Sequence, residues 1–310
     1  MAKSSAEKCN VTLQGSPSIW MLAAAIQSAI WFFAIPPLLK PHWSSFFDGF
    51  SSSIAEATLF LMIIPFFLLY MLVVALPPYL LQWKCFEQYK ISNLSWPWLD
   101  DRATVRDAFW KLTYKTIKLE CVLMFILFPL MLCTKAIIVS HSALSFSDDN
   151  WPTYAKSSVD LISLALVHEF FFYWTHRVFH MYPQLYKYHK VHHEYKQNNV
   201  LASQYFHPID FILSIGGPAI LTTVIVQPHS ITQFQFGLWI LCANFDDHLG
   251  YAFPWSPVRW FPLAPATDCH EFHHSVNMGC YSSKLILWDV IFGTDQAYRK
   301  WREGRCSTAD

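Results

Sequence analysis

Histidine is the residue type whose number and spacing point to chemistry in this chain. The sequence contains 14 histidines, and 12 of them follow residue 160. Eight of these fall into three short clusters: the pair His176 and His180, the triplet His189, His192 and His193, and the triplet His270, His273 and His274. Because imidazole is the commonest metal ligand among side chains, the second half of the chain is predicted to hold a metal site.

The spacing within the clusters has a geometric meaning. His176 and His180 are four residues apart, which places both rings on one face of a helix within reach of one metal ion. Each triplet has the form H-x-x-H-H, so that two of its rings can serve one ion and the third a neighbouring ion. Two triplets and a pair supply enough nitrogen for two ions. His248 is a ninth candidate ligand, and His207 is an additional one.

The other histidines are interpreted as ordinary residues. His42, His141 and His229 stand alone in the sequence, which is typical of surface or interface histidines. His168 lies two turns before His176 in the same helical pattern and is interpreted as a hydrogen-bonded helix residue. We expect none of these four residues to bind metal.

The number of histidines limits the kind of metal site. A structural zinc site uses four protein ligands and a hydrolytic zinc site three, so the nine or ten candidates exceed both. A haem held by two histidines needs single residues on opposed helices rather than clusters. Imidazole suits zinc, copper, nickel and iron, but zinc cannot activate oxygen because it has no redox chemistry. A dinuclear redox site fits the count best.

The composition indicates that the elements carrying these histidines belong to a membrane protein. Hydrophobic residues make up 54% of the 310 residues and charged residues only 14%, against about 25% charged residues in soluble domains. Lys plus Arg and Asp plus Glu number 22 each, so no net charge recruits nucleic acid. The eight cysteines form no C-x-x-C pair and are interpreted as reduced thiols.

Apolar runs predict an all-helical bundle with about four membrane spans. The four runs are residues 18–39, 57–83, 119–139 and 160–174. The first run ends at Pro36 and Pro37, where a helix should stop or kink because proline has no amide donor. Two further runs, residues 211–227 and 231–245, are predicted to form a short hairpin that dips into the bilayer. The first of these two runs is interrupted by Gly216, Gly217 and Pro218, and the turn between them contains Pro228 and His229.

Basic residues set the expected orientation. The segment 84–118 carries seven Lys and Arg residues, whereas the loops after the first and third spans carry only Lys40 and Lys156. The positive-inside rule therefore places segment 84–118, and after four spans also the histidine clusters, on the cytosolic side. Within this segment an apolar face at helical spacing predicts either an amphipathic helix in the membrane interface or a solvated linker helix: Val105, Phe109, Leu112 and Thr116.

The order and form of the three histidine clusters resemble the histidine boxes of the sterol desaturase and fatty acid hydroxylase superfamily. The resemblance covers roughly residues 155–300. Within it, residues 248–255 and 288–294 resemble the branch that contains 4-methylsterol oxidase and cholesterol 25-hydroxylase, and residues 205–210 are similar to the 4-methylsterol oxidases. Three residues depart from the patterns of those oxidases. Cys269 stands where they tend to have histidine, Phe172 stands where some of them have histidine, and Cys280 stands where asparagine is common.

This resemblance implies a membrane-bound non-haem di-iron monooxygenase that oxidises a sterol, with 4-methylsterol oxidation in sterol biosynthesis favoured. It implies that the eight histidines of the three boxes bind two iron ions, for which zinc can substitute in preparations. The co-substrates would be O2 and electrons from NAD(P)H, delivered by a cytochrome b-type carrier and its reductase at the cytosolic face of the endoplasmic reticulum. The lipid would enter along four aromatic residues, for which plain helix packing is the alternative interpretation: Phe170, Phe171, Tyr173 and Trp174.

Other functions and arrangements remain open at this stage. The same scaffold serves sterol desaturation, sterol side-chain hydroxylation, and hydroxylation of fatty acyl chains or sphingoid bases. A zinc-binding membrane transporter would also use many histidines, but it should place ionisable residues deep in several spans, and the first two spans have none.

We divide the chain into residues 1–120, with the first spans and the interfacial helix, and residues 121–310, with further spans and the catalytic histidines. A homo-oligomer or a sterol-processing complex is compatible with each of these functions.

Overall fold

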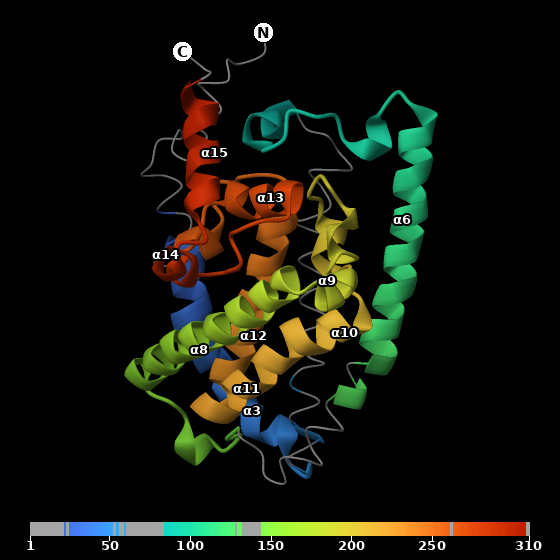
Figure 1. Ribbon diagram of the computed structural model, residues 1–310. Coiled ribbons are helices and arrows are strands. Elements are labelled where there is room, and N and C mark those ends of the chain that lie inside the picture. The colour runs from blue at the N-terminus through green and yellow to red at the C-terminus, as the bar shows by residue number, and fades with distance from the viewer. Residues whose placement is uncertain are drawn as a thin grey trace.

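A computed structural model shows an all-helical architecture (Figure 1). It describes residues 22, 25–51, 54, 55, 59, 84–127, 129–131, 144–260 and 263–307. Within these ranges the β-type pairings are two isolated bridges, which join Lys90 to Tyr251 and Ser145 to His229. The prediction of an all-helical protein is therefore confirmed for the part of the chain that the structure describes.

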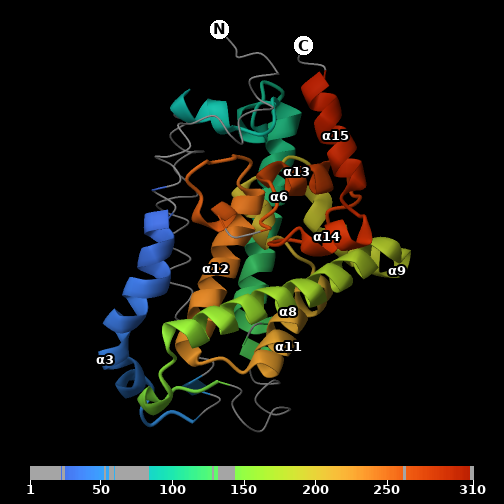
Figure 2. The same ribbon diagram turned by 90° about the vertical axis from the view of Figure 1, so that its left-hand side faces the viewer.

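Two long helices, α8 (Tyr154–Met181) and α12 (Ser230–His248), frame the histidine clusters (Figures 1 and 2). The hydroxyl of Thr153 caps the first turn of α8, and Nδ1 of His229 caps the first turn of α12. Such caps satisfy amide donors that have no partner inside the helix. The two helices pack against each other around a buried apolar core: Leu164, Ala165, Phe236, Trp239 and Ala243.

Shorter helices complete the frame and carry the second and third histidine clusters. They are α9 (Pro183–His189), the 3-10 helix η7 (His192–Glu194), α13 (Thr267–Val276), α14 (Leu287–Phe292) and α15 (Gln296–Ser307). α9 packs against α8, and α13 packs against α12 and α15. Single 3-10 turns connect these helices elsewhere: η3 (Lys84–Tyr89), η4 (Pro97–Leu99), η6 (Asp148–Asn150), η8 (Val200–Gln204) and η10 (Pro257–Trp260).

A further long helix, α6 (Ala103–Val122), stands beside this frame (Figure 1). It continues into the π-helix η5 (Leu123–Leu127), so the predicted amphipathic helix and the start of the predicted third span form one element. The helix itself is confirmed. Its apolar face packs on protein, because Phe109 on that face is buried against Tyr195, Ala202 and Tyr205. Whether the helix lies in the membrane interface stays a prediction.

The apolar run after residue 207 is continuous rather than interrupted. It consists of α10 (Pro208–Asp210), the π-helix η9 (Phe211–Gly216) and α11 (Gly217–Val226). The predicted break at Gly216 was wrong, because this glycine makes room for a neighbour: a Cβ there would lie 1.9 Å from Met131 Cε. The turn before α12 is confirmed, and it begins at Gln227, which has a left-handed backbone conformation.

The helix at residues 25–47 also passes through its prolines. A π-helix, η1 (Ile30–Ala34), leads directly into α3 (Ile35–Phe47). Pro36 and Pro37 stand in the first turn of α3, where a missing amide donor costs little. Of the predicted stop or kink at these prolines, the stop was therefore wrong. The predicted second span, residues 57–83, lies outside the described residues except for residue 59.

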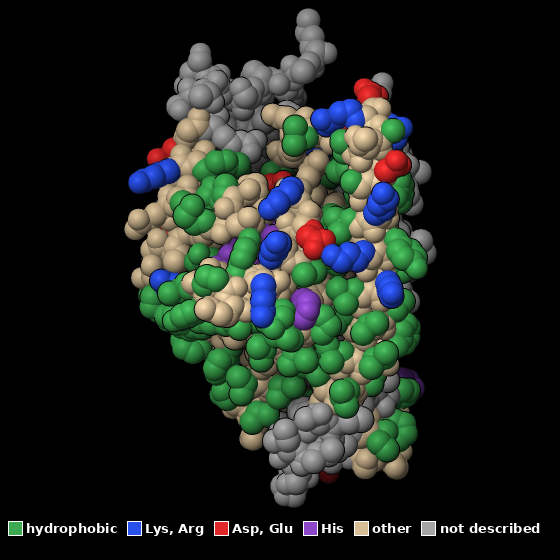
Figure 3. Space-filling view, turned by 45° about the vertical axis from the view of Figure 1, so that its right-hand side comes forward, with side chains coloured by type: hydrophobic (Ala, Val, Ile, Leu, Met, Phe, Trp, Pro, Cys, Tyr) green, Lys and Arg blue, Asp and Glu red, His purple; other side chains and the backbone are tan. Residues whose placement is uncertain are grey.

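Among the described residues, Pro208–Val226 is the helix that is long and apolar enough to cross a membrane. The prediction of about four spans thus finds support for a single membrane-length helix, in a segment where a shallow hairpin was expected. Figure 3 shows apolar side chains covering one end of a face of the molecule, below a zone with many Lys and Arg side chains. The helix Pro208–Val226 exposes Leu213, Leu221 and Ile225, and the segment after α6 exposes Phe125, Ile126 and Leu130.

Candidate metal centre

The structure brings nine candidate histidines into two groups inside the frame. The first group consists of His176, His180, His189, His193 and His273, and the second group of His192, His248, His270 and His274. Within each group the facing ring nitrogens all lie within 4.8 Å of one another. All of these residues are buried except His180, which is partly exposed.

Each triplet divides between the two groups. The two rings that stay together are the first and last of each triplet: His189 with His193, and His270 with His274. His270 and His274 are four residues apart on α13 and share a face of that helix, whereas His273 points toward the other group. His189 ends α9 and His193 lies in η7, so the turn between these elements brings their rings together. The expected division of two rings to one group and one to the other is thus present. One consequence is that backbone neighbours, such as His192 and His193, belong to different groups.

Oxygen acceptors fix the orientation of five of the nine rings. The Nδ1 atom of each ring lies within hydrogen-bond distance of a carbonyl or carboxylate oxygen, so Nδ1 carries the proton and Nε2 keeps its lone pair. The pairs are His176 with Tyr281 O (2.8 Å), His189 with Asp210 Oδ2 (2.8 Å), His192 with Tyr205 O (3.3 Å), His248 with Asn244 O (2.7 Å) and His273 with Gly279 O (2.7 Å). Most of these acceptors are main-chain carbonyls.

The Nε2 atoms that face the interior of each group carry lone pairs and lie close to one another. His176 Nε2 lies 3.0 Å from His189 Nε2, and His192 Nε2 lies 3.3 Å from His248 Nε2. None of these four atoms has a proton to donate, because the proton of each ring is on Nδ1. Nitrogens bound at about 2.0–2.1 Å to a tetrahedral ion are spaced by roughly 3.3–3.4 Å, which is close to these separations. The donor set therefore fits one metal ion in each group.

Burial keeps the rings in the neutral form that binds metal. Burial and the positive charge that a neighbouring imidazole would carry together lower the pKa of His176 from 6.5 to about 3. The same causes hold the pKa of five more rings well below 6.5: His192, His193, His270, His273 and His274. Neutral imidazole is the ligand form, so these environments favour metal over protons.

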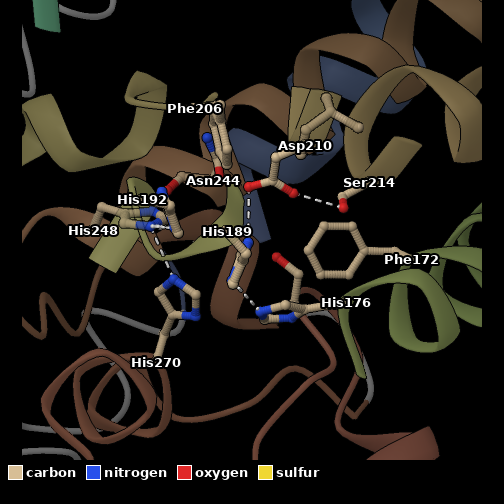
Figure 4. A pocket seen from close by; sticks show the side chains of 12 residues that line it. Phe172, His176, His189, His192, Phe206, Asp210, Ser214, Asn244, His248 and His270 are labelled. Carbon is tan, nitrogen blue, oxygen red and sulfur yellow. Dashed lines mark hydrogen bonds and ion pairs between the residues drawn. The ribbon is translucent and has the colours of Figure 1, made fainter. Parts of the chain in front are cut away.

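A small cavity reaches both groups (Figure 4). Five of the histidines contribute to its wall: His176 and His189 of the first group, and His192, His248 and His270 of the second group. The rest of the wall is partly apolar and partly polar: Phe172, Phe206, Ile215, Asp210, Ser214, Asn244 and Ser283. An apolar group in this cavity would lie beside histidine rings of both groups.

The aromatic residues that were expected to line a substrate channel do not line this cavity. Phe170 packs against Trp288, and both Tyr173 and Trp174 pack against Phe292. These contacts join α8 to α14, so the interpretation of these rings as helix packing holds. The aromatic residue of α8 that does line the cavity is Phe172, whose ring lies 5.3 Å from that of His176.

Asp210 has a role that sequence reasoning did not assign. Its carboxylate is buried and accepts hydrogen bonds from His189 Nδ1 and Ser214 Oγ, both at 2.8 Å (Figure 4). A carboxylate behind a metal-binding histidine fixes the ring and makes its free nitrogen a stronger donor. A signal was present in the sequence, because Asp210 is the only ionisable residue in the apolar run 208–226.

The remaining histidines lie outside both groups. His207 accepts the amide N–H of Ile209 at 3.2 Å and thereby caps α10. His168 is buried beside Phe172, away from the two groups. His42 is exposed, as expected, and His141 lies outside the described residues. His229 was expected at a surface or interface but is buried, where it caps α12.

Comparison with known proteins identifies the family. The fatty acid hydroxylase family model matches residues 161–294, close to the expected range of residues 155–300. The chain is also 34% identical over 188 residues to very-long-chain aldehyde decarbonylase GL1-11 of Oryza sativa subsp. indica, which is 58% of this chain and 70% of the rice protein. The chain belongs to the fatty acid hydroxylase family.

Other members of this family with similar sequences are named methylsterol monooxygenases. Methylsterol monooxygenase 2-2 of Arabidopsis thaliana is 37% identical over 153 residues, covering 48% of this chain and 57% of that protein. Methylsterol monooxygenase 1-1 of the same plant is 34% identical over 154 residues, covering 48% of this chain and 50% of that protein. The chain therefore spans between half and 70% of the length of these relatives. No solved structure matches it.

The cysteines that depart from the oxidase pattern do not disturb the fatty acid hydroxylase histidines. Cys269 and Cys280 are both buried, and Cys269 Sγ lies 2.8 Å from Cys280 Sγ. They pack with Phe272 and Tyr298, on the side of α13 that contacts α15. Neither cysteine belongs to a histidine group.

Proposed function

We propose that this member of the fatty acid hydroxylase family is an O2-dependent monooxygenase that oxidises a sterol, with 4-methylsterols as the favoured substrates. One observation carries the proposal: two adjoining groups of buried, neutral histidines share the wall of a partly apolar cavity. The names of the Arabidopsis thaliana relatives supply the substrate class. The centre is too buried and too rich in histidine to suit a transporter, whose ionisable residues should lie along several spans.

The first and second groups would each hold one iron ion. When bound, the two ions supply the redox chemistry that activates O2 for insertion of oxygen into a C–H bond. Iron is favoured over zinc because the proposed reaction needs a redox metal. Zinc would nevertheless occupy the groups in some preparations, because it stands above ferrous iron in the order of affinities.

The chain itself holds the ligands and shapes the cavity. Carbonyl acceptors hold the protons on Nδ1, so each of the oriented rings presents Nε2 to the metal. Asp210 supports His189 in the same way from the cavity wall. Phe172, Phe206 and Ile215 would contact the apolar part of the substrate and exclude water from the reacting carbon. These residues are therefore proposed as the substrate contacts.

A second candidate reaction follows from other relatives. The rice proteins with 32–34% identity are named very-long-chain aldehyde decarbonylases, which indicates that the same histidine arrangement serves linear lipids. The alternative substrates are accordingly fatty acyl chains, long-chain aldehydes or sphingoid bases. A rigid sterol and a linear chain differ in the width that they demand of the cavity, so substrate profiling separates the two proposals.

We also propose that the protein lies in the endoplasmic reticulum membrane with its metal centre facing the cytosol, in the catalytic region 121–310. The apolar helix Pro208–Val226 and the exposed apolar side chains beside it support membrane contact. A cytochrome b-type donor, with its reductase, would supply the electrons.

The docking surface proposed for this donor consists of exposed lysines on α6 and around the second histidine cluster (Figure 3): Lys111, Lys115, Lys118, Lys187, Lys190 and Lys196. Lys190 directly follows the buried ligand candidate His189, so the path from this surface to the first group is short. Lys115 is paired with Glu194 at 2.9 Å, which leaves the other lysines to attract an acidic partner.

The experiment that tests the proposed function combines metal content with lipid analysis. We expect the purified protein to bind two metal ions per chain, and cells that lack it to accumulate a 4-methylsterol. Wild-type protein should clear this precursor, whereas His192→Ala should not, although the variant still reaches the membrane. His42→Ala, which changes an exposed histidine outside both groups, serves as the control. Binding of a single ion, or accumulation of a long-chain aldehyde with unchanged sterols, would contradict the proposal.

A further inference from the structure

The segment 279–285, between α13 and α14, directs all five of its last amide groups toward two buried carboxylates. The N–H groups of Tyr281 and Ser282 donate to Asp289, each at 2.8 Å. The next three N–H groups donate to a single oxygen, Oε2 of Glu169, from Ser283 (3.0 Å), Lys284 (2.9 Å) and Leu285 (3.1 Å). Consecutive amides aimed at one anion form a strong, directional anchor.

The two carboxylates come from different parts of the fold. Glu169 lies on α8, two turns before His176, and its side chain is fully buried. Asp289 lies on α14, is also buried, and accepts a further hydrogen bond from the hydroxyl of Thr294. Segment 279–285 is thus held from both sides, and a buried carboxylate tolerates this position because N–H donors replace its water.

The same segment orients two rings of the first group. Its Gly279 carbonyl accepts the proton of His273 Nδ1 at 2.7 Å, and its Tyr281 carbonyl accepts that of His176 Nδ1 at 2.8 Å. Gly279 has a φ of +70°, and a Cβ there would lie 2.5 Å from the carbonyl oxygen of Thr294. The direction of the Gly279 carbonyl therefore depends on a backbone conformation that the surrounding structure must enforce.

The second group takes its known acceptors from elsewhere. His248 donates to the carbonyl of Asn244 on its own helix, and His192 donates to the carbonyl of Tyr205. Neither acceptor belongs to segment 279–285. Ser283 Oγ (3.2 Å) and Lys284 Nζ (2.9 Å) of the segment do bond Asp247, the residue before His248, but they contact no ring nitrogen of the second group. A displacement of this segment should consequently disturb the rings of the first group more than those of the second.

We infer that Glu169 and Asp289 are positioning residues for the first group: through segment 279–285 they fix the protonated nitrogen and the direction of His176 and His273. The inference rests on the proposed function in one respect, namely that the groups bind metal. It assigns a role to two carboxylates that contact no ligand nitrogen themselves. The effect of changing them should be a loss of metal affinity confined to one of the two groups.

The test is a Co²⁺ titration of the purified full-length protein in detergent, followed by absorption spectroscopy and metal analysis. Glu169→Gln and Asp289→Asn keep the side-chain shape but remove the charge that anchors the amides. Each should weaken one of the two Co²⁺ equivalents by about 10–100-fold, the range seen when a group behind a ligand is lost. Glu303→Gln, an exposed change on α15, is the matched control.

Single-group backgrounds identify which equivalent is lost. With the second group disabled by His248→Ala, Glu169→Gln should weaken the remaining site, and with the first group disabled by His273→Ala it should have less than a threefold effect. Equal weakening in both backgrounds, or none in either, would overturn the inference. If a carboxylate variant cannot be purified, Thr294→Val should give a smaller loss with the same selectivity, because it removes the hydroxyl that donates to Asp289 and that also lies 3.2 Å from the Tyr173 hydroxyl. Wild-type protein that binds fewer than two Co²⁺ ions would instead refute the proposed function.

Discussion

Replacement of Asp210 tests the link between the cavity wall and the metal centre. The carboxylate accepts two buried hydrogen bonds, from His189 Nδ1 and from Ser214 Oγ, both at 2.8 Å. Asp210→Ala removes both acceptors. A buried donor left without a partner costs about 1–3 kcal/mol, so the two together should lower the free energy of unfolding by about 2–6 kcal/mol. Loss of the group behind His189 should also lower metal affinity by about 10–100-fold.

Two milder substitutions at this site should lower metal affinity less than Asp210→Ala does. In Asp210→Asn the amide oxygen can still accept from His189, and the Ser214 hydroxyl can rotate to accept from the amide nitrogen. The variant therefore keeps both hydrogen bonds but loses the charge, which roughly halves their strength. Ser214→Ala leaves the bond to His189 in place. The expected order of metal loss is Asp210→Ala, then Asp210→Asn, then Ser214→Ala.

The assay is competition for metal between the protein and a calibrated chelator, with thermal melting of the metal-free protein as a separate measure of stability. Metal affinity and melting temperature should both fall in Asp210→Ala, whereas Ser214→Ala should lower only the melting temperature. The reasoning fails if Asp210→Ala holds metal as tightly as the wild type, or if Ser214→Ala weakens metal as much as Asp210→Ala does.

Three further outcomes follow from the structure. Charge reversal of Lys187 and Lys190 to Glu should slow turnover driven by the protein donor by about tenfold at low salt, and this difference should shrink as the salt concentration rises. Lys300→Glu on α15 should have little effect, and the doubly substituted enzyme should react at the wild-type rate when it is reduced chemically. His229→Ala removes the cap of α12 and should lower the free energy of unfolding by about 1 kcal/mol. Burial lowers the pKa of His229, so the unfolded state binds more protons below about pH 6.5, and the wild type should lose stability as the pH falls through that value, whereas melting curves of the variant should lack this contribution. Gly250→Ala should lower the melting temperature more than a typical surface change does, because Gly250 has a φ of +72° and a Cβ would lie 2.7 Å from Asn198 O; an unchanged melting temperature would contradict this.

The convergence of the histidines was largely predictable because a set of residues suited to metal ligation leaves a local signal. Residue type and the spacing of four along a helix are both visible in the sequence, and the nine candidates with the strongest pattern are the nine that converge. The assignment of each histidine ring to one of the two groups was harder to predict from the sequence. It depends on where α9 ends, at His189, and on how α13 packs against α12. Both are properties of the tertiary structure.

The supports of the centre were harder to predict, because most of them are backbone atoms. The carbonyls of Asn244, Gly279 and Tyr281 accept ring protons, and no residue type announces such a role. Glu169 is an ionisable residue within the apolar run 160–174, but the amides that donate to it lie more than 100 residues away in the sequence. Only the fold reveals them.

The predicted helix boundaries failed for a common reason. Proline was expected to stop or kink the helix at Pro36, and glycine to interrupt it at Gly216, yet the helix continues in both places. A π-helical turn ends just before Pro36, and another includes Gly216. At Pro36 the first turn of the next helical segment needs no amide donor. At Gly216 the missing side chain makes room for Met131. A composition rule cannot distinguish these uses from a true helix end.

The π-helix η9 makes the centre sensitive to chain length as well as to side-chain identity. A π-helical turn holds one residue more than an α-helical turn, and one residue corresponds to a rotation of about 100° around the helix axis. Asp210 precedes this turn, and α11 follows it. Deletion of one residue within Phe211–Gly216 would restore a regular helix and turn Asp210 away from His189 while α11 stayed in place. Among related chains, insertions and deletions in this short stretch would thus alter the support of the metal centre without any change in its histidines.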